Sequence, residues 1–251
     1  AGNAPVGFES PEDQSPMNLP LFHVKVCGVT TPADAAMVAA AGADAVGLNF
    51  VAGSPRAVNV AAAREVRASL PPGVLAVGVF AGMPAAEMLE VARAIGLDAI
   101  QLHGHLDGEG PATDPPSRCL ELIGLPVIRA VRLEADGLGA ARRWIAAAMA
   151  AGRGPDMVIV DAGVAQTAAG GVLGGTGHRV DWGALAREEP LPVPAALAGG
   201  LTPENVAAAI QATGTCGVDT ASGVEDSPGR KNADLVGRFV AAARAALGNG
   251  G

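Results

Sequence analysis

Short apolar runs recur along the chain from residue 21 and alternate with Ala-rich segments that have the period of a helix. Each run is short enough for one strand, and its nearly continuous apolar character is typical of a strand buried on both faces. We expect eight strands, at Val24–Cys27, Ala45–Phe50, Leu75–Phe80, Ala99–His103, Val127–Val131, Met157–Asp161, Ala195–Ala198 and Gly217–Ala221.

The segments between these runs predict helices, several with recognisable ends. Thr31 followed by Pro32 is typical of a helix start, and Gly96 is typical of a helix end. The expected helices are Pro32–Ala41, Val60–Leu70, Pro84–Ile95, Ser117–Ile123, Asp136–Ala151, Asp181–Arg187, Pro203–Ala212 and Asn232–Leu247.

Eight strand–helix units in a chain of 251 residues indicate an α/β protein that folds as a single closed parallel (β/α)8 TIM barrel. The alternative is a doubly wound open sheet. Because no G-x-G-x-x-G follows the first strand, a dinucleotide-binding version of that sheet lacks support. Residues 1–20 are rich in Pro, Gly and acids without apolar period, so we assign them to a flexible N-terminal extension and residues 21–251 to the barrel.

Composition narrows the partners and the compartment. The chain is 49% hydrophobic, but its uncharged stretches are short and interrupted by Gly or Pro, so no membrane span is expected. A net charge of −8 argues against nucleic acid as the main partner. Three cysteines are too few for a disulfide scaffold and fit a reducing compartment, which predicts a cytoplasmic protein.

Active sites of such barrels lie at the carboxyl ends of the strands. The thiol of Cys27 closes the first strand, and Lys25 shares its face, where an ammonium favours the reactive thiolate. The carboxyl of Asp161 closes the apolar sixth strand, a setting that suits a general acid. The alternatives are a buried structural thiol for Cys27 and a helix cap or ion-pair partner for Asp161.

Three more polar side chains end strands or follow them. Arg56 follows a Ser-Pro turn after the second strand, where its guanidinium suits a carboxylate held by a bidentate fork; the alternative is a solvated loop arginine. Gln101 and His103 share one face of the fourth strand and are expected to line the site. No second ligand lies at a suitable spacing from His103, so no metal is predicted.

Glycines gather after the last three strands, where barrel enzymes commonly bind phosphate. Bare backbone N–H groups can approach an anion closely, and a helix starting near Pro203 adds its positive dipole end. The alternative is that they serve only as turn residues. The candidates for phosphate binding are Gly175, Gly177, Gly199, Gly200, Ser222 and Gly223.

Most of the polar residues and glycines singled out above lie in six longer stretches. They are Lys25-Val-Cys-Gly-Val-Thr, Ser54-Pro-Arg56, Gln101-Leu-His-Gly104, Gly174-Gly-Thr-Gly177, Ala198-Gly-Gly-Leu-Thr-Pro-Glu-Asn205, and Gly217-Val-Asp-Thr-Ala-Ser-Gly-Val-Glu225 followed by Pro228-Gly229-Lys231. Together these stretches resemble the phosphoribosylanthranilate isomerase family of tryptophan biosynthesis, and the resemblance spans about residues 23 to 245.

The resemblance implies an Amadori rearrangement without metal or cofactor, with Cys27 as base, Asp161 as acid and Arg56 binding anthranilate. It implies a small phosphosugar substrate, with neither nucleic acid nor membrane as partner, and a monomer or homodimer. His178 stands where the family often has Lys, and Ala221 where Ser or Asn is frequent.

Two other functions remain open from the residues alone. A related phosphosugar isomerase of histidine synthesis uses two Asp, one of them closing the first strand, where this chain has Cys27. A non-catalytic metabolite-binding relative would have no need for thiol, acid and Arg56 together.

Overall fold

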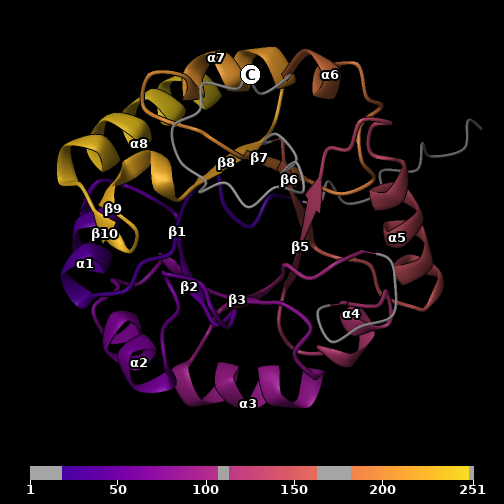
Figure 1. Ribbon diagram of the computed structural model, residues 1–251, viewed down its shortest axis with the longest axis horizontal. Helices are drawn as coiled ribbons and strands as arrows, with labels where there is room; N and C mark the ends of the chain where they lie inside the picture. The colour runs from indigo at the N-terminus through magenta and orange to yellow at the C-terminus, as the bar shows by residue number, and fades with distance from the viewer. Residues whose placement is uncertain (1–18, 107–112, 163–181, 249–251) are drawn as a thin grey trace, which may run out of the picture.

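The computed structural model describes residues 19–106, 113–162 and 182–248, and these form a closed barrel of eight parallel strands in sequence order. Figure 1 looks along the barrel, with the strands in the centre and the helices outside. The strands are β1 Val24–Cys27, β2 Ala45–Asn49, β3 Leu75–Phe80, β4 Ala99–Leu102, β5 Val127–Arg132, β6 Met157–Asp161, β7 Ala195–Ala198 and β8 Gly217–Thr220. The expected fold and all eight strands are confirmed.

A helix follows each strand, as the alternation predicts. The helices are α1 Pro32–Ala40, α2 Val60–Ala68, α3 Ala85–Ile95, α4 Arg118–Glu121, α5 Gly139–Ala150, α6 Trp182–Ala186, α7 Val206–Thr213 and α8 Ala233–Gly248. Two short features have no counterpart among the predicted elements: the helical turn η1 Ser222–Val224, and the two-stranded hairpin of β9 Glu225–Ser227 and β10 Arg230–Lys231. This hairpin lies beside β1 and α1 (Figure 1).

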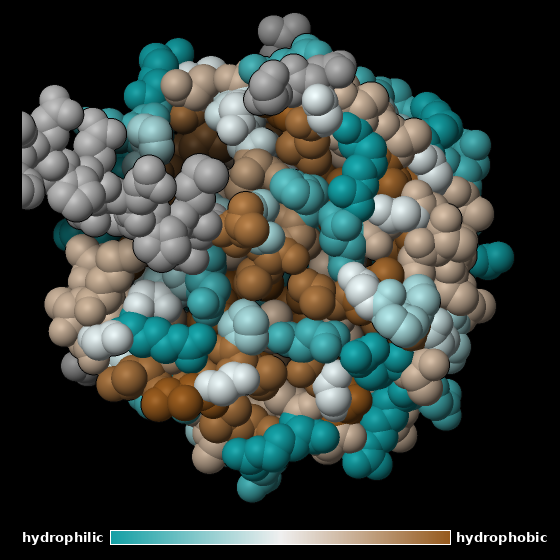
Figure 2. Space-filling view, turned by 180° about the vertical axis from the view of Figure 1, so that it is seen from behind, coloured by the Kyte–Doolittle hydropathy of each residue, from teal (hydrophilic) through white to brown (hydrophobic). Residues whose placement is uncertain are grey.

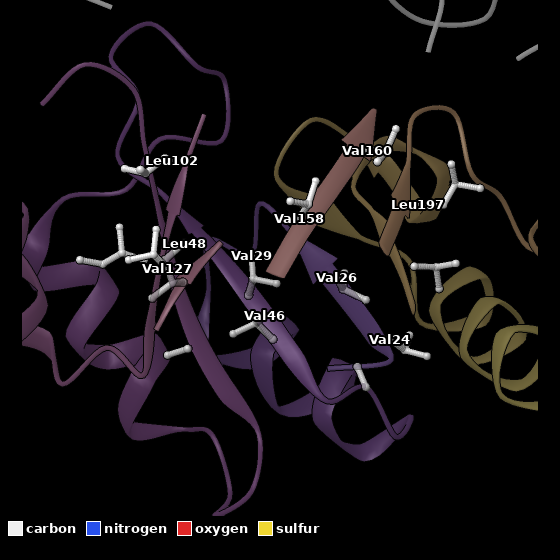
Figure 3. Packing of buried hydrophobic residues seen from close by; sticks show 14 of the residues in the cluster. Val24, Val26, Val29, Val46, Leu48, Leu102, Val127, Val158, Val160 and Leu197 are labelled. Carbon is white, nitrogen blue, oxygen red and sulfur yellow. The ribbon is translucent and has the colours of Figure 1, made fainter. Parts of the chain in front are cut away.

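Alternate residues of each strand face two separate apolar regions. Val24, Val26, Val46 and Leu48 point outward into the large core between the strands and the helices (Figure 3). The barrel interior is filled by a smaller cluster of Phe22, Ala45, Val77, Ala99, Ile128, Met157, Ile159 and Ala196. This two-sided burial explains why the strands are nearly continuous apolar runs.

Closure of the barrel decides which polar side chains meet inside it. β1 pairs with β2 on one side and with β8 on the other, and Lys25 lies opposite both Ala45 and Asp219. Lys25 and Asp219 are the charged residues that this register places side by side in the interior. The contact that closes the barrel therefore brings together β1 and β8, which lie near the two ends of the chain.

Local capping fixes where several helices begin. The Thr31 hydroxyl accepts from Asp34 N at 3.1 Å, and Asn59 Oδ1 accepts from Ala62 N at 2.9 Å. Each contact satisfies a backbone donor that the first helical turn leaves open. These caps therefore fix where α1 and α2 begin.

A buried ion pair holds Asp114, shortly before α4, against the barrel. Arg129 and Asp114 are fully buried and lie 3.4 Å apart, while the Arg129 guanidinium stacks 4.9 Å from the centre of the Trp144 ring. Burial lowers the pKa of Arg129 to about 10 against the opposing effect of Asp114. Asp114 also accepts from the backbone N–H groups of Gly82 and Gly104, which ties the ends of β3 and β4 together.

On the reverse side of the molecule, hydrophobic residues gather at the centre, with hydrophilic residues between and around them (Figure 2). No helix in the described parts of the chain combines the length and the apolar character needed to cross a bilayer.

Candidate active site

The described site residues come from the carboxyl ends of β1, β4 and β6 and from the loops after β2, β7 and β8. Cys27 and Asp161 are the last residues of β1 and β6, and both are half-buried. Because parallel strands end at one side of a barrel, this arrangement places the candidate base and the candidate acid at one mouth.

A buried ion pair lies directly beneath Cys27. Nζ of Lys25 donates to both carboxylate oxygens of Asp219 at 3.0 and 3.1 Å, and the Lys25 side chain is completely buried. Burial opposes the ammonium, but the charge of Asp219 and the adjacent Cys27 outweigh it and raise the pKa of Lys25. The cation next to the thiol is therefore retained at neutral pH.

Gly47 on β2 provides the space in which these groups meet. A methyl group on Gly47 would lie 2.7 Å from Cys27 Sγ and 3.1 Å from Lys25 Nζ. Both atoms thus lie over the bare Cα of this glycine. Any larger residue would have to displace the thiol, the ammonium or the strand.

Arg56 folds back over the end of β1. Gly28 has a φ of +72°, and a Cβ there would lie 2.3 Å from Arg56 Cδ, so the arginine stem occupies the space above Gly28. Arg56 is thereby placed next to Cys27, and the charge of Cys27 contributes to raising the pKa of Arg56, although the hydrogen bond to Glu225 is the main cause.

The bidentate edge of Arg56 is already occupied by Glu225. Nε of Arg56 donates to the two Glu225 oxygens at 2.9 and 3.1 Å, and Nη2 donates at 2.7 Å. Lys231 donates to the same carboxylate at 2.6 Å. The expected fork to a ligand carboxylate is therefore restricted to the terminal edge of the guanidinium, formed by Nη1 and Nη2.

His103 and Gln101 line the mouth and the interior beneath it. His103 is an exposed residue at the rim, but desolvation by the protein around its imidazole lowers the pKa of this group. The charges of Lys25 and Arg129 lower it further, and those of Asp161 and Asp219 oppose the shift. Its imidazole is therefore mostly neutral at pH 7. Gln101 is 2% exposed, and its Oε1 has no hydrogen-bond partner among the described residues.

The loops after β7 and β8 are in direct contact. A Cβ on Gly223 would lie 1.9 Å from the carbonyl oxygen of Leu201, and Thr220 Oγ1 donates to that oxygen at 2.8 Å. Gly199 and Gly200 have φ values of +96° and +62°, which favour glycine at both positions. These contacts bring the Gly199–Gly200 turn and the Ser222–Gly223 turn to one place.

Some expectations lie outside the described residues, including those for Gly175 and Gly177 and for most of the N-terminal extension. Among the residues that the structure describes, no group of three or more His, Cys, Asp or Glu could hold a metal ion.

Three charged residues of the site have no role predicted from the sequence, although they stand within or just after the last strand motif: Asp219, Glu225 and Lys231. Asp219 becomes informative only once β1 and β8 are known to pair. Glu225 and Lys231 become informative once the hairpin folds back over β1.

The comparisons with known proteins agree with this geometry. A family profile for N-(5'phosphoribosyl)anthranilate (PRA) isomerase matches residues 24–242. The N-(5'-phosphoribosyl)anthranilate isomerase of Rubrobacter xylanophilus is 44% identical over 222 residues, covering 88% of this chain and 98% of that protein. The chain belongs to the phosphoribosylanthranilate isomerase family.

Other relatives and solved structures support this family assignment. The isomerase of Acidithiobacillus ferrooxidans is 40% identical over 90% of this chain and 99% of its own length. The crystal structure of phosphoribosyl anthranilate isomerase from Thermotoga maritima superposes with a TM-score of 0.73 at 32% identity, covering 89% of this chain and 99% of that one. Another isomerase structure, in complex with reduced 1-(o-carboxyphenylamino)-1-deoxyribulose 5-phosphate, gives a TM-score of 0.67 at 30% identity over 89% of this chain and 99% of that one.

Proposed function

We propose that this chain catalyses the Amadori rearrangement of N-(5'-phosphoribosyl)anthranilate to 1-(2-carboxyphenylamino)-1-deoxyribulose 5-phosphate in tryptophan biosynthesis. The observation that carries the proposal is the thiol of Cys27 beside the buried Lys25–Asp219 pair, at the same mouth as Asp161, in a chain of this family. The reaction is an internal aldose–ketose isomerisation and requires no oxidant or cofactor.

Asp161 acts first as the general acid. Its proton goes to the ring oxygen of the ribose, the bond from that oxygen to C1′ breaks, and the anthranilate nitrogen forms a Schiff base. The position of Asp161 at the end of an apolar strand limits the access of water to one side of the carboxyl, which suits a proton donor.

Cys27 then acts as the general base. Its thiolate takes the proton from C2′, the electron pair moves to form the C1′–C2′ double bond, and the resulting enolamine tautomerises to the ketone. The Lys25 ammonium, held by Asp219, stabilises the negative sulfur before the proton is taken. Overall, C1′ gains the hydrogen that C2′ loses, and the proton that leaves the C2′ hydroxyl replaces the one that Asp161 gave to the ring oxygen, so no electrons enter or leave the substrate.

Binding of the two ends of the substrate orients the reacting carbons. Arg56 binds the anthranilate carboxylate through its terminal edge, and neutral His103 and Gln101 offer hydrogen bonds at the mouth. The phosphate lies at the Gly199–Gly200 and Ser222–Gly223 turns, joined by Gly175 and Gly177. Binding energy from groups remote from the reaction is what makes such positioning effective.

We also expect a small phosphosugar ligand with no nucleic-acid or membrane partner, a cytoplasmic location, and a monomer or homodimer. For the Thermotoga maritima isomerase, which is described as dimeric, a crystal structure of generated monomers is also known.

The test is turnover of N-(5'-phosphoribosyl)anthranilate generated in situ, followed as loss of the substrate's fluorescence. The wild-type chain is expected to turn over the substrate, and Asp161→Asn is expected to lower kcat by about 10²- to 10⁴-fold, the usual contribution of a positioned acid. Cys216→Ala is the control, because Cys216 lies at the opposite end of β8. A wild-type rate in Asp161→Asn would show that Asp161 is not the general acid.

A further inference from the structure

The hairpin of β9 and β10 carries two buried charged residues, Glu225 and Lys231, that the reaction steps leave unused. The Glu225 side chain is 3% exposed and lies between Arg56 and Lys231. Burial alone would raise the pKa of Glu225, but its hydrogen bonds and charges from Arg56 and Lys231 outweigh that and lower it. The carboxylate is therefore ionised at neutral pH, and the chain of three groups keeps one net positive charge.

Lys231 connects this chain of charges to the backbone of the base. Its side chain is fully buried, and Nζ donates to the carbonyl oxygen of Cys27 at 2.6 Å and to that of Ala221 at 3.2 Å. One ammonium thus binds Glu225, the end of β1 and the end of β8. Displacement of any one of these partners changes the position of the other two.

The hairpin itself is fastened to the turn after β1. Thr30 Oγ1 donates to the carbonyl oxygen of Gly229 at 2.7 Å, and Gly229 N donates to Glu225 Oε1 at 3.2 Å. The Glu225 carboxylate is therefore held by the turn of the hairpin and by Lys231 on β10, so that it forms a fixed reference for Arg56.

We propose that Glu225 is a positioning residue, which sets the direction of the Arg56 guanidinium and, through Lys231, its distance from Cys27. The inference rests on the proposed function, in which Arg56 binds the anthranilate carboxylate. With Nε and Nη2 held by Glu225, the guanidinium plane is fixed and only its terminal edge faces a ligand. The distance between the anthranilate carboxylate, bound by Arg56, and C2′ of the substrate, which faces the Cys27 thiolate, is then fixed.

Two physical effects make this arrangement useful. Arginine loses side-chain entropy when it binds a ligand, and an arginine already held by Glu225 has lost it before the substrate arrives. Glu225 also balances one of two neighbouring cations, so that Arg56 and Lys231 can lie together beside Cys27 without repelling each other apart.

The test compares Glu225→Gln with wild type. The amide keeps the size of the side chain but loses the charge and one acceptor. We expect kcat/KM for N-(5'-phosphoribosyl)anthranilate to fall by about 10²-fold, the scale of an ångström of misplacement, and the Kd of the reduced product analogue to rise. The Kd of inorganic phosphate is expected to stay unchanged, which a general loss of structure would not allow.

A double-mutant cycle shows whether Glu225 acts through Arg56. In an Arg56→Ala background, Glu225→Gln is expected to change the Kd of the reduced analogue by no more than about twofold, because the group that it orients is gone. Glu121→Gln is the matched control, since Glu121 forms an Arg–Glu pair at 2.9 Å with Arg118 on α4, away from the mouth. If Glu225→Gln does not fold, Glu225→Asp is used in the same cycle.

The outcomes separate this inference from the proposed function. Wild-type turnover with an unchanged kcat/KM and analogue Kd in Glu225→Gln overturns the positioning role and leaves the isomerase assignment intact. Equal effects of Glu225→Gln with and without Arg56 also overturn it. A wild-type chain that binds the analogue without turnover contradicts the proposed function, and the Kd cycle still decides the role of Glu225.

Discussion

At the scale of single residues, the site depends on small side chains as much as on charged ones. Gly28 leaves room for the stem of Arg56, Gly47 leaves room for Cys27 and Lys25, and Gly223 lets two loops touch. The roles proposed for Cys27 and Asp161 rest on their positions at strand ends. Their surroundings depend on glycines that the sequence marks only as turn or strand residues.

Gly47→Ala tests the shared space beneath the thiol. The new methyl group would lie 2.7 Å from Cys27 Sγ, so the thiol and the ammonium must move apart. We expect kcat to fall by about 10-fold or more, because displaced reacting groups lose their alignment. Gly78→Ala on the neighbouring strand is the control: its methyl group meets Leu97 at 2.5 Å, outside the barrel interior, and should lower stability rather than kcat. Equal kcat in Gly47→Ala and wild type would show that catalysis does not depend on the space that Gly47 leaves for Cys27 and Lys25.

At the scale of elements, buried ion pairs hold two loop regions against the barrel. One pair, Arg129 and Asp114, holds the residues just before α4, and the other, Glu225 with its two cations, holds the hairpin after β8. Removing one member of a buried pair leaves an uncompensated charge, whereas an exposed pair contributes little.

Asp114→Asn is expected to lower the free energy of unfolding by about 3 kcal/mol or more, because Arg129 then stays buried without its charge partner. Urea unfolding followed by tryptophan fluorescence measures the loss, since Trp144 stacks on Arg129. Glu121→Gln, in an exposed pair, is expected to change the same quantity by less than about 0.5 kcal/mol. A loss in Asp114→Asn as small as in this control would show that the pair does not support the fold.

Acid should weaken the hairpin through Glu225. Its folded pKa lies below the ordinary value of 4.5, so the contribution of its carboxylate is complete above that value and is lost as pH falls through the folded pKa. The gap in unfolding free energy between wild type and Glu225→Gln should therefore narrow when urea unfolding is moved from about pH 6 to about pH 3.5. A gap that is constant over this range would contradict the assignment.

The difference between what the sequence predicts and what the structure adds also lies at this scale. The barrel strands are predictable because burial on both faces makes them apolar runs, and the period of two places Lys25 beneath Cys27. β9 and β10 are short and mostly polar, so they carry no such signal. The pairing of Lys25 with Asp219 depends on barrel closure across nearly the whole chain, which no local pattern contains.

At the scale of the whole molecule, closure of the barrel holds the described site residues together at one of its mouths. Phe22 is 2% exposed and belongs to the interior cluster, so the barrel needs the chain from about this residue onward. The contact between β1 and β8 closes the barrel and brings Cys27, Asp219 and the hairpin together. Stability and the geometry of the site therefore depend on the same closure.

Deletion of residues 1–18 is expected to leave the melting temperature and kcat/KM unchanged, because the interior cluster begins at Phe22. The companion variant Phe22→Ala removes a buried ring and is expected to lower the free energy of unfolding by about 3 to 5 kcal/mol. Thermal unfolding and the fluorescence assay measure both variants. A large loss of stability on deletion would show that the extension belongs to the folded unit.

The central claim is that a thiolate at the end of β1 removes a proton from an aminoaldose phosphate. The most direct measurement is the single-turnover rate of N-(5'-phosphoribosyl)anthranilate with enzyme in excess, compared between wild type, Cys27→Ala and Cys119→Ala. Cys119 is the control because it is buried in α4, where burial raises the pKa of its thiol to about 11. The account predicts wild-type turnover in Cys119→Ala and a loss of about 10²-fold or more in Cys27→Ala. A Cys27→Ala rate equal to that of wild type would contradict it.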